Sequence, residues 1–252
     1  MILRKAWMGY VRKLTALENT AKTTMETWMG ENGLGDTDSL IGYAYGVATK
    51  YGEASAALAA TMYDELAALA GKILPAAELA DTATFGEVAE TVTGILRKSQ
   101  NPEILSSSVS RLVKQAGADT TLKNAARDGA EFAWVPNGDT CAFCVMLASN
   151  GWKKAGKKAL RGGHAQHIHS NCDCTYAVRF DERDGVQGYD PNRYLKMYEN
   201  ADGATWQDKV NAMRRDFYAE NAEEINAQKR SAYAKRRERE SSKAEETDVN
   251  GG

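Results

Sequence analysis

Residues 132–144 read FAWVPNGDTCAFC, and within them the chain changes from a helical to a β-prone pattern. Phe132-Ala133-Trp134-Val135 is rich in aromatic and β-branched residues, which is typical of a strand. The run stops at Pro136-Asn137-Gly138, which is typical of a turn. A second β-prone run, TYAVRF, covers residues 175–180. Because the two runs bracket the segment between them, they could pair as the stem of a compact module.

The chain upstream of this stretch, to about residue 130, is predicted to be helical. Its first apolar residues recur at steps of three and four, which places them on one helical face; they are Leu3, Trp7, Tyr10, Val11, Leu14, Leu17 and Ala21. An alanine-rich helix is predicted from about Ser39 to Ile73, with Pro75 ending it. We expect this half of the chain to be a helical assembly domain or scaffold without catalytic chemistry.

Three patterns predict where further helices begin in this half. Thr84-Phe85-Gly86-Glu87 is a capping box, in which the first and last side chains each bond a backbone N–H of the other residue. Asn101-Pro102 combines a cap with proline in the first turn. Asp119 is a candidate cap for one more helix.

The chain after Asp181 is polar and rich in charge. Helices are predicted to begin near Asp190-Pro191 and at Thr205. The second of them carries an apolar stripe made of Trp206, Val210, Met213 and Phe217. A basic run follows, containing Lys229, Arg230, Lys235, Arg236, Arg237 and Arg239. The closing residues are predicted to be disordered.

Composition excludes several classes of protein. The chain has 252 residues, of which 43% are hydrophobic, so it can bury a core and is not disordered throughout. A net charge of −2 excludes a globally basic nucleic-acid binder, although not a local basic patch. The N-terminus lacks a signal peptide, and no stretch approaches about 18 uninterrupted apolar residues, so we expect neither export nor a membrane span. In a reducing cytoplasm, clustered cysteines bind metal more often than they pair with each other.

Every cysteine and histidine of the protein lies between Cys141 and Cys174. Cys141-Ala142-Phe143-Cys144 is a C-x-x-C pair, and His169-Ser170-Asn171-Cys172-Asp173-Cys174 follows about 25 residues later. The two-residue gap lets two thiolates curl toward one ion, and tetrahedral zinc takes four sulfur or imidazole ligands. Two ligand pairs, each beside a β-prone run, predict a small structural zinc module.

The sequence offers more donors than one zinc ion needs. The preferred ligands are Cys141, Cys144, His169 and Cys172, with Cys174 an equal rival to His169; His164 and His167 are further donors nearby. A structural ion contributes of the order of 10 kcal/mol to folding. A module this small would therefore lose its fold without the ion. The alternatives are buried thiols without metal, or a redox C-x-x-C.

Between the ligand pairs lies a basic loop that contains Trp152. No acidic residue occurs from Cys141 through Asn171. The candidate contacts to a phosphate backbone or another acidic surface are Lys153, Lys154, Lys157, Lys158 and Arg161. The alternative is a solvated surface loop, with Trp152 packed on the zinc module.

Known catalytic uses of such residues fit this chain poorly. Zinc deaminases place proline before the C-x-x-C and His-x-Glu upstream, but Thr140 precedes Cys141 and no histidine lies upstream. A thioredoxin-type site needs a βαβ context, which the helical half does not offer. A metal-dependent nuclease could use His164, His167 and His169, yet Asp173 is the only acidic residue close to them. We therefore expect a protein that is not an enzyme.

The pattern of Cys141-Ala142-Phe143-Cys144, a basic loop and His169-Ser170-Asn171-Cys172-Asp173-Cys174 resembles the C-terminal module of phage minor head proteins of the Mu F type. That module, C-x-x-C followed by H-x-x-C-x-C after a helical region, corresponds to residues 131–180. Ser170 stands where many members have proline, and His164 and His167 are additional.

The resemblance implies a minor capsid protein, active in head morphogenesis and made in the host cytoplasm. Its implied location is the virion, in the capsid interior, where it would associate with the portal protein and capsid components and could contact packaged DNA. The alternative function is a metal-dependent nucleic-acid enzyme, such as a nuclease-type effector that uses the Cys/His cluster.

The expected fold is therefore mainly α. A helical domain (residues 1–130) precedes a small zinc-stabilised α+β module that holds the Cys/His site (131–182). A charged helical extension (183–240) and a disordered tail (241–252) complete the chain.

Overall fold

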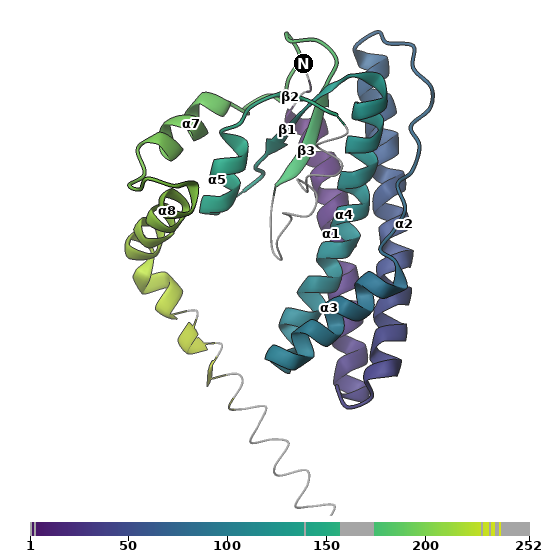
Figure 1. Cartoon of the computed structure of the whole chain (residues 1–252), viewed down its shortest axis with the longest axis vertical. Helices are drawn as coiled ribbons and strands as arrows, with labels where there is room; N and C mark the ends of the chain where they lie inside the picture. Colours follow the sequence, from purple (N-terminus) through teal and green to yellow (C-terminus); the bar gives the residue numbers. More distant parts are fainter. Residues whose placement is uncertain are drawn as a thin grey trace, which may run out of the picture. The chain divides into compact units, whose positions relative to one another are not determined.

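The computed structural model describes residues 2, 4–138, 140–156, 174–227, 229–231, 233, 234 and 237. A mainly helical N-terminal bundle is followed by a small three-stranded antiparallel sheet (Figure 1). The predicted order of a helical domain and a small module containing strands is confirmed, whereas the zinc ion of that module stays a prediction. The chain divides into two compact units, Met1–Lys196 and Met197–Gly252. None of the described helices is long and apolar enough to cross a membrane. The domain boundaries given above stay predictions.

Four helices form the bundle of the first unit: α1 (Arg4–Asn32), α2 (Thr37–Leu69), α3 (Phe85–Lys98) and α4 (Pro102–Asp128). Helices α1, α2 and α4 pack along one another, and the shorter α3 packs on α2 and α4 at the end of the bundle away from the sheet (Figure 1). One buried cluster fills that end, with Met25, Leu40, Val88, Val92 and Val109 among its members. The apolar side chains that recur at helical spacing therefore pack between the helices.

Helix ends follow local capping chemistry, with two differences from the predictions. Thr84 and Glu87 form the predicted capping box, and Asn101 caps α4. Helix α2, however, ends at Leu69 and not at Ile73. Gly71 has a φ of 66°, a left-handed conformation that favours glycine and ends the helix before Pro75 is reached.

The prediction that Asp119 caps a helix is wrong. Helix α4 runs without interruption from Pro102 to Asp128 and ends at the left-handed Gly129, so Asp119 lies inside it. Burial raises the pKa of Asp119 to about 6; a side-chain hydrogen bond from Gln115 acts against this shift, and the charge of Glu87 adds to it. An aspartate in such a place costs stability when it is ionised.

Replacing Asp119 with asparagine is expected to stabilise the protein above pH 6. Because the pKa is higher in the folded than in the unfolded state, folded protein binds more protons between about pH 4 and pH 6, and stability falls as pH rises through that window. At pH 7 the substitution should raise the free energy of unfolding by of the order of 1–3 kcal/mol. Urea unfolding between pH 4 and pH 8 measures it, with the exposed Asp81→Asn as the control. Equal pH profiles for Asp119→Asn and the unchanged protein would contradict the expectation.

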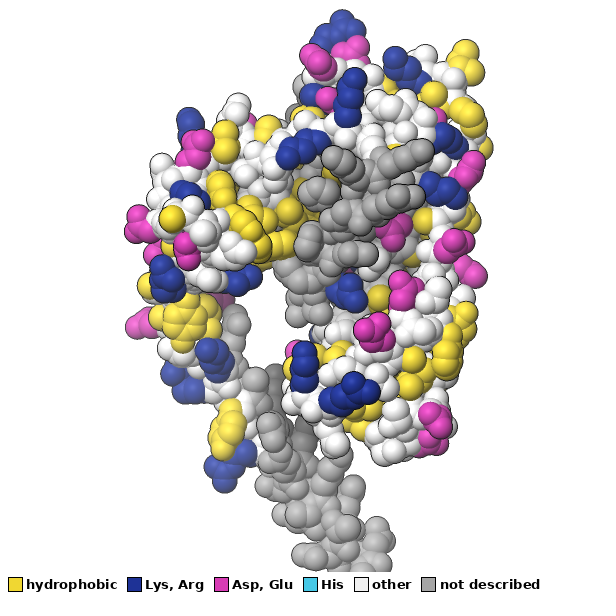
Figure 2. Space-filling view, in the orientation of Figure 1, with side chains coloured by type: hydrophobic (Ala, Val, Ile, Leu, Met, Phe, Trp, Pro, Cys, Tyr) yellow, Lys and Arg dark blue, Asp and Glu magenta, His cyan; other side chains and the backbone are white. Residues whose placement is uncertain are grey.

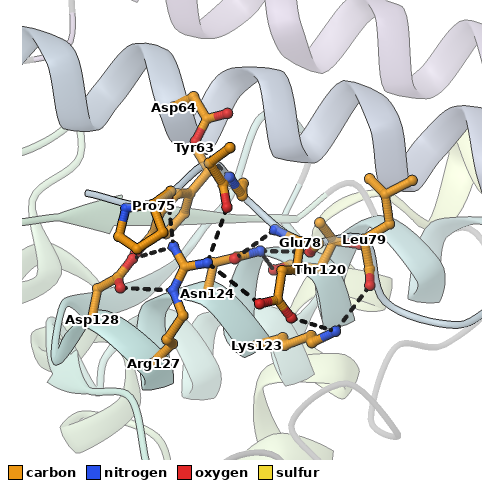
Figure 3. A network of polar contacts seen from close by, with 12 residues as sticks. Tyr63, Asp64, Pro75, Glu78, Leu79, Thr120, Lys123, Asn124, Arg127 and Asp128 are labelled. Carbon is orange, nitrogen blue, oxygen red and sulfur yellow. Dashed lines mark hydrogen bonds and ion pairs between the residues drawn. The ribbon is translucent and has the colours of Figure 1, made fainter. Parts of the chain in front are cut away.

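The segment between α2 and α3, residues 70–84, lies along α4 and is held there by polar side chains (Figure 3). Asn124 accepts the N–H of Glu78 at 2.9 Å and donates to the carbonyl of the same residue at 2.8 Å. Arg127 donates to the carbonyls of Pro75 and Ala76 at 2.9 and 3.0 Å. These bonds replace the backbone pairing that an extended segment lacks.

The sheet has the strand order β2-β1-β3, formed by β1 (Glu131–Val135), β2 (Lys153–Lys154) and β3 (Thr175–Arg179). The predicted pairing of the two β-prone runs is confirmed, and β1 and β3 are antiparallel, with Trp134 opposite Tyr176. Strand β2 was not predicted. A short helix, α5 (Ala142–Ala148), follows β1.

Both faces of the β1–β3 pair are buried, because β1 carries apolar side chains at successive positions. Phe132 and Trp134 belong to a cluster that also contains residues of α4 and α5. Ala133 and Val135 belong to a second cluster, with Trp7 of α1. Successive strand residues point to opposite faces, so the continuous apolar run predicts this two-sided burial.

Helix α7 (Pro191–Glu199) leads into the second unit, which contains α8 (Trp206–Glu220). Thr205 caps α8 as predicted, in a capping box with Asp208. Lys209 donates to the carbonyls of Tyr198, Glu199 and Ala201 at the end of α7. In the apolar stripe of α8, Val210 is buried, whereas Trp206 and Phe217 are exposed. The tail at 241–252 lies outside the described residues.

Candidate metal centre

The C-x-x-C pair forms the start of α5. Cys141 is the N-cap of the helix, with extended backbone, and its Sγ accepts the N–H of Cys144 at 3.5 Å. Cys141 is exposed, whereas Cys144 is 0% exposed. Backbone N–H donors at a helix start stabilise a thiolate, which is the form that binds metal. The local fold therefore suits Cys141 to ligation.

Cys144 and Cys174 lie in the same buried cluster, although 30 positions separate them in the chain. The strand pair β1 and β3 brings them there, since Cys174 directly precedes β3. Trp134 and Tyr176 make an edge-to-face aromatic contact in this cluster, with ring centroids 4.3 Å apart and nearly perpendicular planes. A buried, apolar environment of this kind has a low dielectric constant, which strengthens electrostatic interactions formed inside it.

Cys174 also faces the bundle. It lines a small cavity together with Tyr10 and Leu14 of α1. Burial raises the pKa of Tyr10 well above its ordinary value, and a hydrogen bond with Thr121 acts against this shift. Burial likewise raises the pKa of Tyr189, and the charges of Tyr194 and Cys174 add to the effect. Both phenols therefore stay protonated at neutral pH.

The remaining candidate ligands lie outside the described residues: His164, His167, His169, Cys172 and Asp173. Within the part of the chain that the structure describes, no three His, Cys, Asp or Glu side chains are close enough to hold a metal ion. Each four-ligand set proposed above includes at least one residue outside that part, so the assignment stays a prediction.

Two of the five predicted phosphate contacts are described, Lys153 and Lys154. They form the edge strand β2, where both are exposed. Lys153 donates to Asn150 Oδ1 at 2.7 Å. Lysines on an edge strand also block pairing with other chains, so their position has a structural use. Lys157, Lys158 and Arg161 lie outside the described residues.

Trp152 packs within the sheet region. The Arg179 guanidinium lies 4.9 Å from its ring centroid, and the Tyr189 ring lies 5.9 Å away. Arg179 also forms an ion pair with Glu131, at 2.6 Å. Trp152 therefore packs against Arg179 of β3 and against Tyr189, whereas its packing on a zinc module stays a prediction.

Asn137 has a role that sequence reasoning missed. Predicted only as a turn residue, it accepts the indole N–H of Trp7 at 2.8 Å and donates to Thr175 Oγ1 at 3.0 Å. It thus joins α1, the turn after β1 and the start of β3. No sequence signal could have found it, because Trp7 and Asn137 are 130 positions apart.

A groove between α1 and α4 was also missed. It has a volume of about 560 Å³ and extends from Met8 to Lys22 along α1, with Asn137 and Gly138 among its lining. We call it the α1–α4 groove. Its residues come from three separate stretches of chain, so no local motif marks it.

These features define a helical bundle protein with a small appended sheet, in which a C-x-x-C pair starts a short helix. The chain belongs to the VG15 protein family, whose model matches residues 1–201. The match covers the whole bundle, the sheet and all of the candidate metal ligands. No curated protein and no solved structure matches the chain.

Proposed function

We propose that this protein is a non-enzymatic minor capsid protein of a phage, a head morphogenesis protein of the Mu F type that associates with the portal inside the head. The observation that carries the proposal is the setting of the C-x-x-C pair. It opens α5 beside the strand pair that leads to Cys174, as a small structural metal module requires. The sequence pattern around it resembles that of minor head proteins.

Zinc is the proposed ion, because it prefers sulfur and imidazole ligands in a closed, structural site. Cys141 and Cys144 fit as one ligand pair, since one N-caps α5 and the other lies one turn further. Cys174 lies in the same buried cluster as Cys144, so His169 and Cys174 stay rival partners of Cys172 in the second pair. When bound, the ion would cross-link the segment after β2 to α5.

A role in assembly is supported by exposed apolar side chains on the bundle. Ile73 is 102% and Leu69 80% exposed, and Leu79 and Phe85 are also exposed. Figure 2 shows hydrophobic side chains along the edge of the molecule formed by α2 and the segment after it. These exposed apolar side chains are available for protein contacts, here proposed with the portal protein or other capsid components. Packaged DNA is a further proposed contact, through Lys153 and Lys154.

Three measurements test the proposal together. Protein purified under reducing conditions should hold about one zinc ion per chain, and a portal protein from the same phage should retain the full-length chain on a column. Purified virions should contain the protein in few copies. Absence of zinc would remove the proposed metal, and absence from virions would remove the capsid role. Metal-dependent cleavage of DNA would instead favour the enzyme alternative.

A further inference from the structure

The α1–α4 groove is a site that the candidate metal centre does not use. Its walls are α1 and α4, which lie against each other in the bundle (Figure 1). Ser110 of α4 donates to the carbonyl of Glu18 of α1 at 3.0 Å and joins the two walls. From Met8 to Lys22 the groove follows α1 for about 20 Å. That length accommodates several phosphates of an extended strand.

The groove is lined by more cations than carboxylates. Arg12 and Lys22 come from α1, Arg111 and Lys114 come from α4, and Glu18 is the acidic residue among the described lining. Lys114 and Glu18 form an ion pair at 3.8 Å. The described lining therefore has a net charge of +3 (four cations, one carboxylate). In a protein whose whole net charge is −2, this is a local excess of positive charge.

Two of these cations are not neutralised by the described part of the protein. Arg12 and Arg111 have no carboxylate within 4.0 Å among the described residues. The guanidinium of Arg111 has a single, long hydrogen bond, to Gln115 Oε1 at 3.4 Å. Its partial burial lowers its pKa, and the charge of Glu87 acts against that shift. A half-buried arginine in this state would be stabilised by an anion in the groove.

Uncharged donors complete the lining. Thr15 and Asn19 of α1, Ser107 of α4 and Asn137 after β1 all reach the groove. Hydroxyl and amide groups of this kind bind phosphate oxygens alongside arginine and lysine. None of the described lining residues is aromatic, so the groove has no platform on which a base could stack. The chemistry therefore suits phosphate groups and not bases.

We propose that the α1–α4 groove binds the phosphates of a polyanion, supplied by a nucleic-acid backbone or by free polyphosphate. The proposal goes beyond the minor capsid function and does not depend on zinc or on the basic residues of β2. Arg12 and Arg111 are the principal contacts. Lys22, Lys114 and the uncharged donors position the chain of phosphates along the groove.

The test measures binding of a fluorescein-labelled single-stranded oligonucleotide to the full chain by anisotropy at several salt concentrations. Calorimetry with inorganic tripolyphosphate forms the second arm. Arg12→Gln combined with Arg111→Gln should weaken binding by about tenfold or more, and should reduce the slope of log affinity against log salt by about 1.5. Arg12→Gln alone alters an exposed residue, so its effect is independent of any change in folding.

Lys13→Gln is the matched control, because Lys13 is an exposed cation beside Arg12 that does not line the groove. It should change affinity less than twofold. Arginine-dependent binding of the oligonucleotide identifies nucleic acid as the source of phosphate, and arginine-dependent binding of tripolyphosphate alone identifies free polyphosphate. The proposal is overturned if the arginine variants bind both probes like the unchanged protein. It is also overturned if binding is lost only in Lys153→Gln/Lys154→Gln, or if polyglutamate binds the groove more tightly than either probe.

Discussion

Replacing Cys144 with serine is expected to release the proposed zinc ion and to unfold the sheet and α5. The thiol is 0% exposed, in a cluster that contains Trp134 and Tyr176. A serine hydroxyl is a poor zinc ligand, and it would leave a polar group in apolar surroundings. Loss of the ion removes of the order of 10 kcal/mol from the folded module. Zinc content by mass spectrometry and hydrogen exchange of the β1 and β3 amides measure the two effects.

Cys144→Ala is the matched variant that separates a ligand from a packed thiol. Alanine removes the sulfur without adding a polar group. If Cys144 binds zinc, alanine and serine should be equally severe, and both variants should be purified without metal. If the thiol only packs, alanine should cost about 1–2 kcal/mol, much less than serine, and zinc content should not change. That second pattern would contradict the metal proposal.

Trp7→Ala should cost about 3–5 kcal/mol of unfolding free energy, the second largest effect that we expect. Trp7 is 1% exposed and packs with Leu66 of α2, Val135 of β1 and Ala177 of β3. Its indole N–H also donates to Asn137 Oδ1 at 2.8 Å. The substitution would leave a cavity where α1 meets the sheet, and it would remove one of the bonds that hold the turn after β1. Urea unfolding followed by circular dichroism measures the loss.

Two controls test the reason for that loss. Trp7→Phe keeps most of the apolar area but removes the indole N–H, so it should cost about 1–2 kcal/mol. Trp206→Ala removes a tryptophan that is 48% exposed, and it should cost less than about 1 kcal/mol. A loss for Trp7→Ala no larger than that for Trp206→Ala would show that Trp7 does not link α1 to the sheet.

Much of the secondary structure could be predicted from the sequence because the signals are local. The capping boxes at Thr84 and Thr205 involve residues three positions apart, and the pattern of Asn101-Pro102 is equally short. The two errors have local causes as well. Gly71 ends α2 earlier than Pro75 would, and Asp119 was interpreted as a cap although α4 continues through it.

The candidate site was predictable only in part. The C-x-x-C pair is evident from its spacing, but its place at the start of α5 follows from a backbone that the spacing does not specify. The burial of Cys144 beside Cys174 depends on the pairing of β1 with β3, a contact between distant parts of the chain. The two-residue strand β2 is too short to have a periodicity of its own.

The sequence by itself determined the helical character of the first half, the caps at Thr84, Asn101 and Thr205, the two β-prone runs and the concentration of every cysteine and histidine in one segment. Only the tertiary structure decided that Asn137 links Trp7 to Thr175, and that Arg12 and Arg111 line one groove. The physical reason is the range of the interactions. Capping and periodicity act over a few residues, whereas a groove or a bridging hydrogen bond forms when packing brings together residues about 100 positions apart.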